Sequence, residues 1–102
     1  MLAPIITNNI NEIKTLCKKH RVKELYVFGS AVSDKFNDES DVDLLVEFDE
    51  MDVLSYADNY FDLIDQLKIV FKRETDLVTV KSIKNPVFKR IINRTKVPLY
   101  LI

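Results

Sequence analysis

Residue types that often mark a functional site are scarce in this sequence of 102 residues, which has one cysteine, one histidine, one glycine and no tryptophan. With a single cysteine there is no internal disulfide, and Cys17 stands at helical spacing from Ile10 and Ile13, which favours a buried apolar role. His20 offers no partner for a histidine metal cluster, and we assemble no Ser-His-Asp triad around it. We expect His20 at the end of a helix, where a cation suits the helix dipole.

Long apolar runs are also missing, and none approaches the roughly 20 residues that span a bilayer. The start, Met1 to Ile6, is apolar but short, and it lacks a basic leader and a cleavage site. We therefore expect a cytoplasmic protein with no membrane contact. The length and a composition of 47% apolar and 30% charged residues predict one globular domain over residues 1–102.

Charge is balanced overall, at a net −1, but it is unevenly distributed. Residues 34–52 hold nine acids and one base, whereas residues 68–96 hold nine bases and only two acids. Two solvated faces of opposite sign would explain this pattern. A metal-collecting acidic cluster beside a basic surface that attracts phosphates or an acidic partner would explain it equally well. The basic run Lys89, Arg90, Arg94 and Lys96 favours a solvated helix face, so we expect no direct nucleic-acid binding.

Apolar spacing predicts the secondary structure. We expect a helix from Asn9 to His20, which Asn9 and Glu12 would cap, and strands at Leu25 to Phe28, Val42 to Phe48 and Asp76 to Val80. A long helix from Val53 to Phe71 would bury Ala57, Tyr60, Ile64, Leu67 and Phe71. A last helix starts at Asn85-Pro86 and turns Phe88, Ile91 and Ile92 inward, and Val97 to Ile102 forms an edge strand or a packed tail. The predicted fold class is α/β (α+β), a small mixed sheet covered by helices.

The only glycine, Gly29, ends the first predicted strand and is followed by Ser30. It is either an ordinary turn glycine or a place where the backbone comes close to a ligand. Asp41 and Asp43 begin the next strand. Their two-residue spacing puts both carboxylates on one face with Cα atoms about 6.5 Å apart. Hard oxygen ligands so placed suit divalent metal, Mg²⁺ or Mn²⁺, although an acidic strand face in solvent would look similar.

Asp76 begins the third predicted strand, where an aspartate is often only a cap or turn residue. If this strand lies beside the second, Asp76 faces the same cluster and serves as a general base or a further metal ligand. Tyr56, Tyr60, Phe61 and Phe71 have helical spacing and are interpreted as core or interface residues.

Gly29-Ser30, ten intervening residues and Asp41-Val42-Asp43 resemble the G-S-x10-D-x-D signature of polymerase-β-type nucleotidyltransferases. The short chain resembles their minimal nucleotidyltransferase (MNT) branch. The resemblance implies that Gly29 and Ser30 bind the triphosphate of ATP. It also implies that Asp41 and Asp43 bind metal and that Asp76 is the third catalytic carboxylate.

Many members of this branch resemble antitoxins that inactivate a HEPN-domain ribonuclease toxin by transferring AMP from ATP to a tyrosine. The resemblance therefore implies a HEPN toxin as partner and leaves an oligomer open. In many relatives an Arg-Gly pair follows the Gly-Ser, where this chain has Ser33-Asp34. That departure favours an alternative, a non-catalytic module that neutralises its partner by occlusion. Nucleotidyl transfer to a small hydroxylated molecule is a third interpretation.

Overall fold

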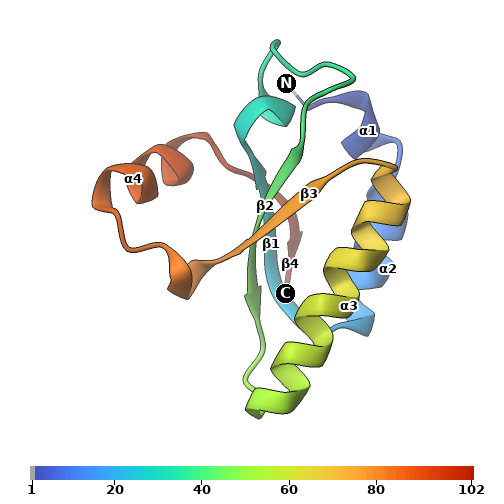
Figure 1. The fold of residues 1–102 in the computed structure, drawn as a ribbon, viewed down its shortest axis with the longest axis vertical. Coiled ribbons are helices and arrows are strands. Elements are labelled where there is room, and N and C mark those ends of the chain that lie inside the picture. Colours follow the sequence, from blue (N-terminus) through green and yellow to red (C-terminus); the bar gives the residue numbers. More distant parts are fainter. Residues whose placement is uncertain (1) are drawn as a thin grey trace.

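Residues 2–102, which the computed structural model describes, form a mixed four-stranded sheet with helices on both faces (Figure 1). The strands are β1 (Val22–Phe28), β2 (Val42–Phe48), β3 (Thr75–Thr79) and β4 (Val97–Leu101), in the order β3-β2-β1-β4. β1 pairs antiparallel with β2 and β4, and β2 pairs parallel with β3. The predicted α/β fold class is confirmed, and Val97 to Ile102 supplies an edge strand.

The helices are α1 (Pro4–Thr7), α2 (Ile10–Lys19), α3 (Val53–Phe71) and α4 (Pro86–Thr95), with two short 3₁₀ turns, η1 (Gly29–Val32) and η2 (Val80–Ser82). α2 and α3 pack against one face of the sheet, and α4 lies on the other (Figure 1). Among residues 2–102, no helix has the length and apolar character needed to cross a membrane.

The β2 and α3 bounds agree with the prediction residue for residue, because both segments have strong signals at both ends. Asp52 caps α3 by accepting a hydrogen bond from the Ser55 amide at 2.7 Å. Lys72 ends the helix in the left-handed conformation, with φ of 56°. The buried face of α3 consists of Leu63, Leu67 and Phe71, so the prediction missed Leu63 and overstated the partly buried Ala57, Tyr60 and Ile64.

The predicted start of the first helix is wrong. Pro4 opens a separate helix, α1, and α2 begins only at Ile10. Asn9 stands at the α2 N-cap, but its side chain does not cap the helix. Its side-chain Nδ2 donates to the Ile5 carbonyl at 2.7 Å instead. Asn9 therefore ties α1 to α2. The other boundary errors are small: β1 begins three residues earlier than predicted, and β3 runs one residue earlier at both ends.

α4 has the predicted start, since the Asn85 side chain accepts from the Val87 and Phe88 amides and Pro86 is the first helical residue. The predicted apolar side is only partly buried. Ile92 is enclosed with Phe28 and Leu45, while Phe88 is 43% and Ile91 55% exposed. Leu45 is buried because α4 covers the second face of β2.

His20 and Cys17 of the α2 region are both buried. Burial raises the pKa of the Cys17 thiol to about 12, which agrees with an inert apolar role. His20 stands at the C-terminal end of α2, as expected. Its Nδ1 lies 2.7 Å from the Leu16 carbonyl and its Nε2 lies 2.5 Å from Asp62 on α3. His20 therefore joins α2 to α3 instead of facing water.

Candidate active site

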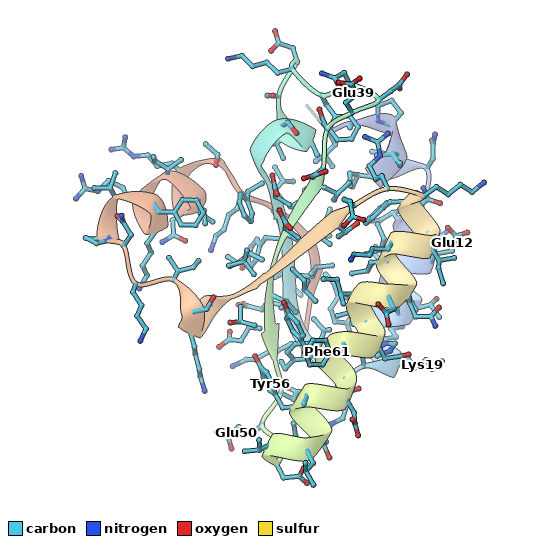
Figure 2. The ribbon with its side chains drawn as sticks, viewed as in Figure 1. Glu12, Lys19, Glu39, Glu50, Tyr56 and Phe61 are labelled. Atoms are coloured by element: carbon cyan, nitrogen blue, oxygen red, sulfur yellow. The ribbon has the colours of Figure 1, made fainter. Side chains whose placement is uncertain are left out.

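Three strand ends meet at one edge of the molecule, and the predicted site residues lie there. Because β1 and β2 are antiparallel, the last residue of β1, Phe28, pairs with Asp43 near the start of β2. Because β2 and β3 are parallel, Asp43 also pairs with Asp76 near the start of β3. The condition under which Asp76 was expected to join the cluster, that β3 lies beside β2, is met. Glu39 precedes β2 in the sequence and Glu50 follows it. The three strand ends lie at the end of the sheet that is nearer to Glu39 (Figure 2).

Gly29 follows Phe28 and turns the chain with φ of +74°, a conformation that residues with a side chain rarely adopt. A Cβ atom at residue 29 would overlap Oδ2 of Asp43. The glycine is therefore required both by the turn and by the carboxylate beside it. Both interpretations of the sequence hold: Gly29 makes the turn after β1, and its backbone comes close to another group, which is a protein side chain.

Asp43 and Asp76 form a strained acidic pair. Asp43 is half-buried, and its pKa is raised from 3.8 to about 6. The largest cause is desolvation. Smaller contributions come from a side-chain hydrogen bond with Asp76, from the charge of Asp76 and from the charge of Asp41. Asp76 itself is exposed. Two carboxyl groups that disfavour each other's charge in this way are stabilised by a cation placed between them.

Asp41 precedes β2, is exposed, and acts on Asp43 through its charge. Within residues 2–102, no three acidic, histidine or cysteine side chains converge as a complete metal-binding cluster. Mg²⁺ needs no such cage, because it is usually bound by one or two carboxylates and takes further ligands from water and substrate phosphates. The donor set fits Mg²⁺ or Mn²⁺: oxygen atoms only, two carboxylates in contact and a third nearby.

Ser30 lies in η1, the turn directly after Gly29, and is half-buried. The carbonyl of Ser30 accepts from both the amide and the hydroxyl of Ser33, at 3.0 Å each. Ser33 thus closes the turn internally, at the position where many relatives carry arginine. Asp34 is exposed and acidic. Ser33 and Asp34 therefore provide no positively charged side chain near the carboxylates.

Two hollows adjoin the carboxylates, and both include Phe28, Asp43 and Phe88 in their walls. One of about 410 Å³ extends past Asp76 toward α3, where Tyr60 and Ile64 line it. The other, of about 580 Å³, extends past Gly29 and Ser33 along α4. Phe28 and Phe88 meet edge to face, with ring centroids 6.3 Å apart. Together the hollows could accommodate two reactants, one on each side of Asp43.

Tyr60, Phe28 and Phe88 also line the site, and no sequence pattern connects them with it. Tyr60 was interpreted as core or interface, and in the structure its hydroxyl donates to the Leu77 carbonyl of β3 at 2.6 Å. The helical spacing of Tyr60 gave no sign that it lines a hollow with Asp76, because that depends on how α3 crosses the sheet. Phe61 is 64% exposed, so of the two alternatives, core or interface, the structure excludes core for this residue.

A turn glycine pressed against a carboxylate pair, at one end of a small mixed sheet, is the architecture of a nucleotidyl-transfer domain. The model of the family described as "Polymerase beta, Nucleotidyltransferase" matches residues 11–101, and the chain belongs to this family. The resemblance drawn from the G-S-x10-D-x-D pattern is thereby confirmed.

Named relatives cover most of the chain. A Methanocaldococcus jannaschii protein, provisionally named a protein adenylyltransferase, is 37% identical over an alignment of 91 residues that covers 81% of this chain and 90% of the relative. The protein adenylyltransferase MntA of Thermococcus cleftensis is 33% identical over 79 residues, 78% of this chain and 77% of that protein.

Solved structures share the fold at lower identity. A minimal nucleotidyltransferase structure superposes with a TM-score of 0.78 at 24% identity and covers 96% of both chains. A crystal structure of a toxin–antitoxin with AMP-PNP gives a TM-score of 0.70 at 23% identity, over 92% of this chain and 74% of that chain. At this level of identity the superpositions show the fold alone.

Proposed function

We propose that this chain is a metal-dependent nucleotidyltransferase that moves AMP from ATP to a hydroxyl of a protein partner. The observation that carries the proposal is the Asp43–Asp76 pair, in which the pKa of Asp43 is raised by burial and by its neighbour. Such a pair is costly to fold without a cation, and a divalent cation with its triphosphate would remove that cost.

Each proposed site residue has a role in this scheme. Asp41 and Asp43 hold Mg²⁺ or Mn²⁺, and Gly29 and Ser30 approach the triphosphate. A divalent cation bound there supplies charge neutralisation on the transferring phosphate. The acceptor oxygen attacks the α-phosphorus of ATP, the bond to the bridging oxygen of the β-phosphate breaks, and pyrophosphate leaves with that electron pair. Asp76, as the exposed member of the pair, takes the proton of the hydroxyl or serves as a further metal ligand.

Two comparisons support a protein as acceptor and a toxin as partner. The Thermococcus cleftensis relative is named a protein adenylyltransferase. One structural neighbour, with a TM-score of 0.64, is described as a tri-AMPylated Shewanella oneidensis HEPN toxin in complex with an MNT antitoxin. We infer that this chain is an antitoxin and that its acceptor is a tyrosine of a HEPN-domain toxin. A tyrosine hydroxyl has a pKa near 10 and would gain from a carboxylate base.

The test is the covalent state of the partner. The chain and its HEPN-domain partner are incubated with Mg²⁺ and with ATP labelled at either the α- or the γ-phosphate, and the intact mass of the partner is measured. We expect α-label and whole AMP units on the partner and no γ-label. Without divalent metal the partner should stay unmodified.

Variants assign the roles. Asp43→Asn should abolish transfer and metal-dependent ATP binding together, whereas Asp76→Asn should abolish transfer and spare ATP binding. The matched control is Asp49→Asn, a half-buried acid just beyond the far end of β2, which should transfer AMP like the wild type. Equal transfer by all three variants would refute the site assignment.

A non-catalytic module is the second candidate. The turn between Ser30 and Ser33 favours it, because Ser33 provides no positively charged side chain there to neutralise the phosphates of a bound nucleotide. The same experiment distinguishes the two. If the toxin is neutralised without gaining mass, and Asp41→Asn, Asp43→Asn and Asp76→Asn neutralise it equally well, occlusion is the function.

A further inference from the structure

Arg73 stands in the short turn between α3 and β3 and reaches across to the segment that leads into β2. Its Nη1 donates to the carbonyls of Asn37 at 3.0 Å and Ser40 at 2.8 Å. Its guanidinium carbon lies 4.5 Å from the centre of the Phe36 ring. One side chain thus makes three contacts within five consecutive residues, 36–40.

This segment leads to Asp41, and it also has internal bonds: the Ser40 amide donates to the Asn37 carbonyl and the Asn37 amide donates to the Ser40 hydroxyl, at 3.0 Å each. The Ser40 carbonyl and the Asp41 nitrogen belong to one planar peptide group. A hydrogen bond to that carbonyl therefore restricts the orientation of the backbone at Asp41. One residue later, the Val42 amide donates to the Glu74 carbonyl at 3.1 Å. Asp41 therefore lies between two links to one short turn, a side-chain link from Arg73 and a backbone link from Glu74.

The arrangement has a cost that its contacts must outweigh. Nε of Arg73 is buried and has no hydrogen-bond partner. A buried unpaired donor is destabilising, and a solvent-facing rotamer of a long arginine would avoid it. The two carbonyls and the Phe36 ring hold the guanidinium against residues 36–40.

We propose that Arg73 is a positioning residue that sets the Asp41 carboxylate for the divalent cation. This inference rests on the proposed metal role of Asp41. Arginine can bridge two carbonyls with its planar fork while stacking on an aromatic ring, whereas lysine offers a single point charge. The same turn leads into β3, which carries Asp76.

The experiment measures the affinity of Mn²⁺ alone for the full chain by electron paramagnetic resonance, together with the melting temperature of each variant. Arg73→Ala should weaken Mn²⁺ binding about tenfold, as is typical when an outer partner of a metal ligand is lost. Arg73→Lys should lie between Arg73→Ala and wild type. Lys84→Ala, which removes an exposed cation between η2 and α4, should bind Mn²⁺ like the wild type.

A double-mutant cycle separates positioning from a general structural role. In the Asp41→Asn background, Arg73→Ala should cause no further loss of Mn²⁺ affinity, because the residue it positions is already gone. Unchanged Mn²⁺ affinity in both Arg73 variants with only a lower melting temperature overturns the proposal, as does an equal loss in both backgrounds. If Arg73→Ala does not fold, Arg73→Lys alone is carried through the cycle.

Wild-type binding is measured first and tests the proposed function separately. A wild type that binds no Mn²⁺ refutes the metal site and this inference with it. A wild type that binds Mn²⁺, with Arg73 variants that bind it equally well, refutes only the role of Arg73.

Discussion

Gly29 leaves the space that the carboxylate of Asp43 occupies: any Cβ atom at residue 29 would overlap Oδ2 of that side chain. Gly29 directly follows β1, and Asp43 on the antiparallel β2 pairs with Phe28, the residue just before Gly29. The glycine and the aspartate of the motif are therefore a steric pair as well as two proposed site residues.

Gly29→Ala should lower stability for two reasons. The left-handed conformation costs a non-glycine residue roughly 1–2 kcal/mol, and the new methyl group displaces Asp43. In the Asp43→Ala background the second cost disappears, so Gly29→Ala should destabilise the chain less there. Chemical denaturation of the four proteins measures this coupling. Equal costs in both backgrounds would mean that Asp43 simply moves aside.

Asp43→Asn should raise the melting temperature of the metal-free chain by a few degrees, because it removes one charge from the pair with Asp76. The same change should remove the dependence of ATP binding on divalent metal. Differential scanning calorimetry and titration calorimetry check the two effects. Asp49→Asn is the control, and an equal rise in its melting temperature would attribute the gain to net charge.

The link between α2 and α3 should make stability depend on pH. The hydrogen bond from His20, with smaller contributions from Lys19 and Gln66, lowers the pKa of Asp62. An acid with a lowered folded-state pKa stabilises the fold above its unfolded pKa of about 3.9, and this contribution is lost as pH falls through the folded value. Asp62→Asn should therefore melt lower than wild type at pH 7, and the difference should shrink below about pH 4. A constant difference between pH 7 and pH 3 would contradict this.

Lys72→Gly should stabilise the chain by about 0.5–1 kcal/mol, since Lys72 ends α3 with φ of 56° and glycine adopts this conformation without steric cost. The midpoint of urea unfolding should rise with an unchanged slope. Lys72→Ala removes the same charge but keeps a Cβ atom, and it should give no such gain. A similar gain from alanine would point to the loss of charge instead.

Sequence patterns were sufficient where a segment carries its own signals. The Val42–Phe48 strand and the Val53–Phe71 helix agree because apolar periodicity and end signals coincide. α1 was missed because four residues show no periodicity. The unexpected bond of Asn9 to Ile5 arises from the tertiary path of the chain.

The site was predicted in its composition but not in its contacts. The two-residue spacing of Asp41 and Asp43 and the start of β3 at Thr75 bring the acids to one end of the sheet, as expected. The steric pairing of Gly29 with Asp43 depends on the register of β1 against β2. The hold of Arg73 on Ser40 joins residues that are 33 positions apart. Neither relationship has a periodic pattern that a single sequence could reveal.

The strand order has a consequence for the newly made chain. β1 is an interior strand only because β4, made of residues 97–101, pairs with its outer side. During synthesis β1 can pair with β2 early, but its other edge stays open until residues 97–101 have left the ribosome. An open edge with the apolar sequence of Val22–Phe28 is a template for pairing with other chains. Loss of β4 should thus cause aggregation of nascent protein before it affects any chemistry at the site.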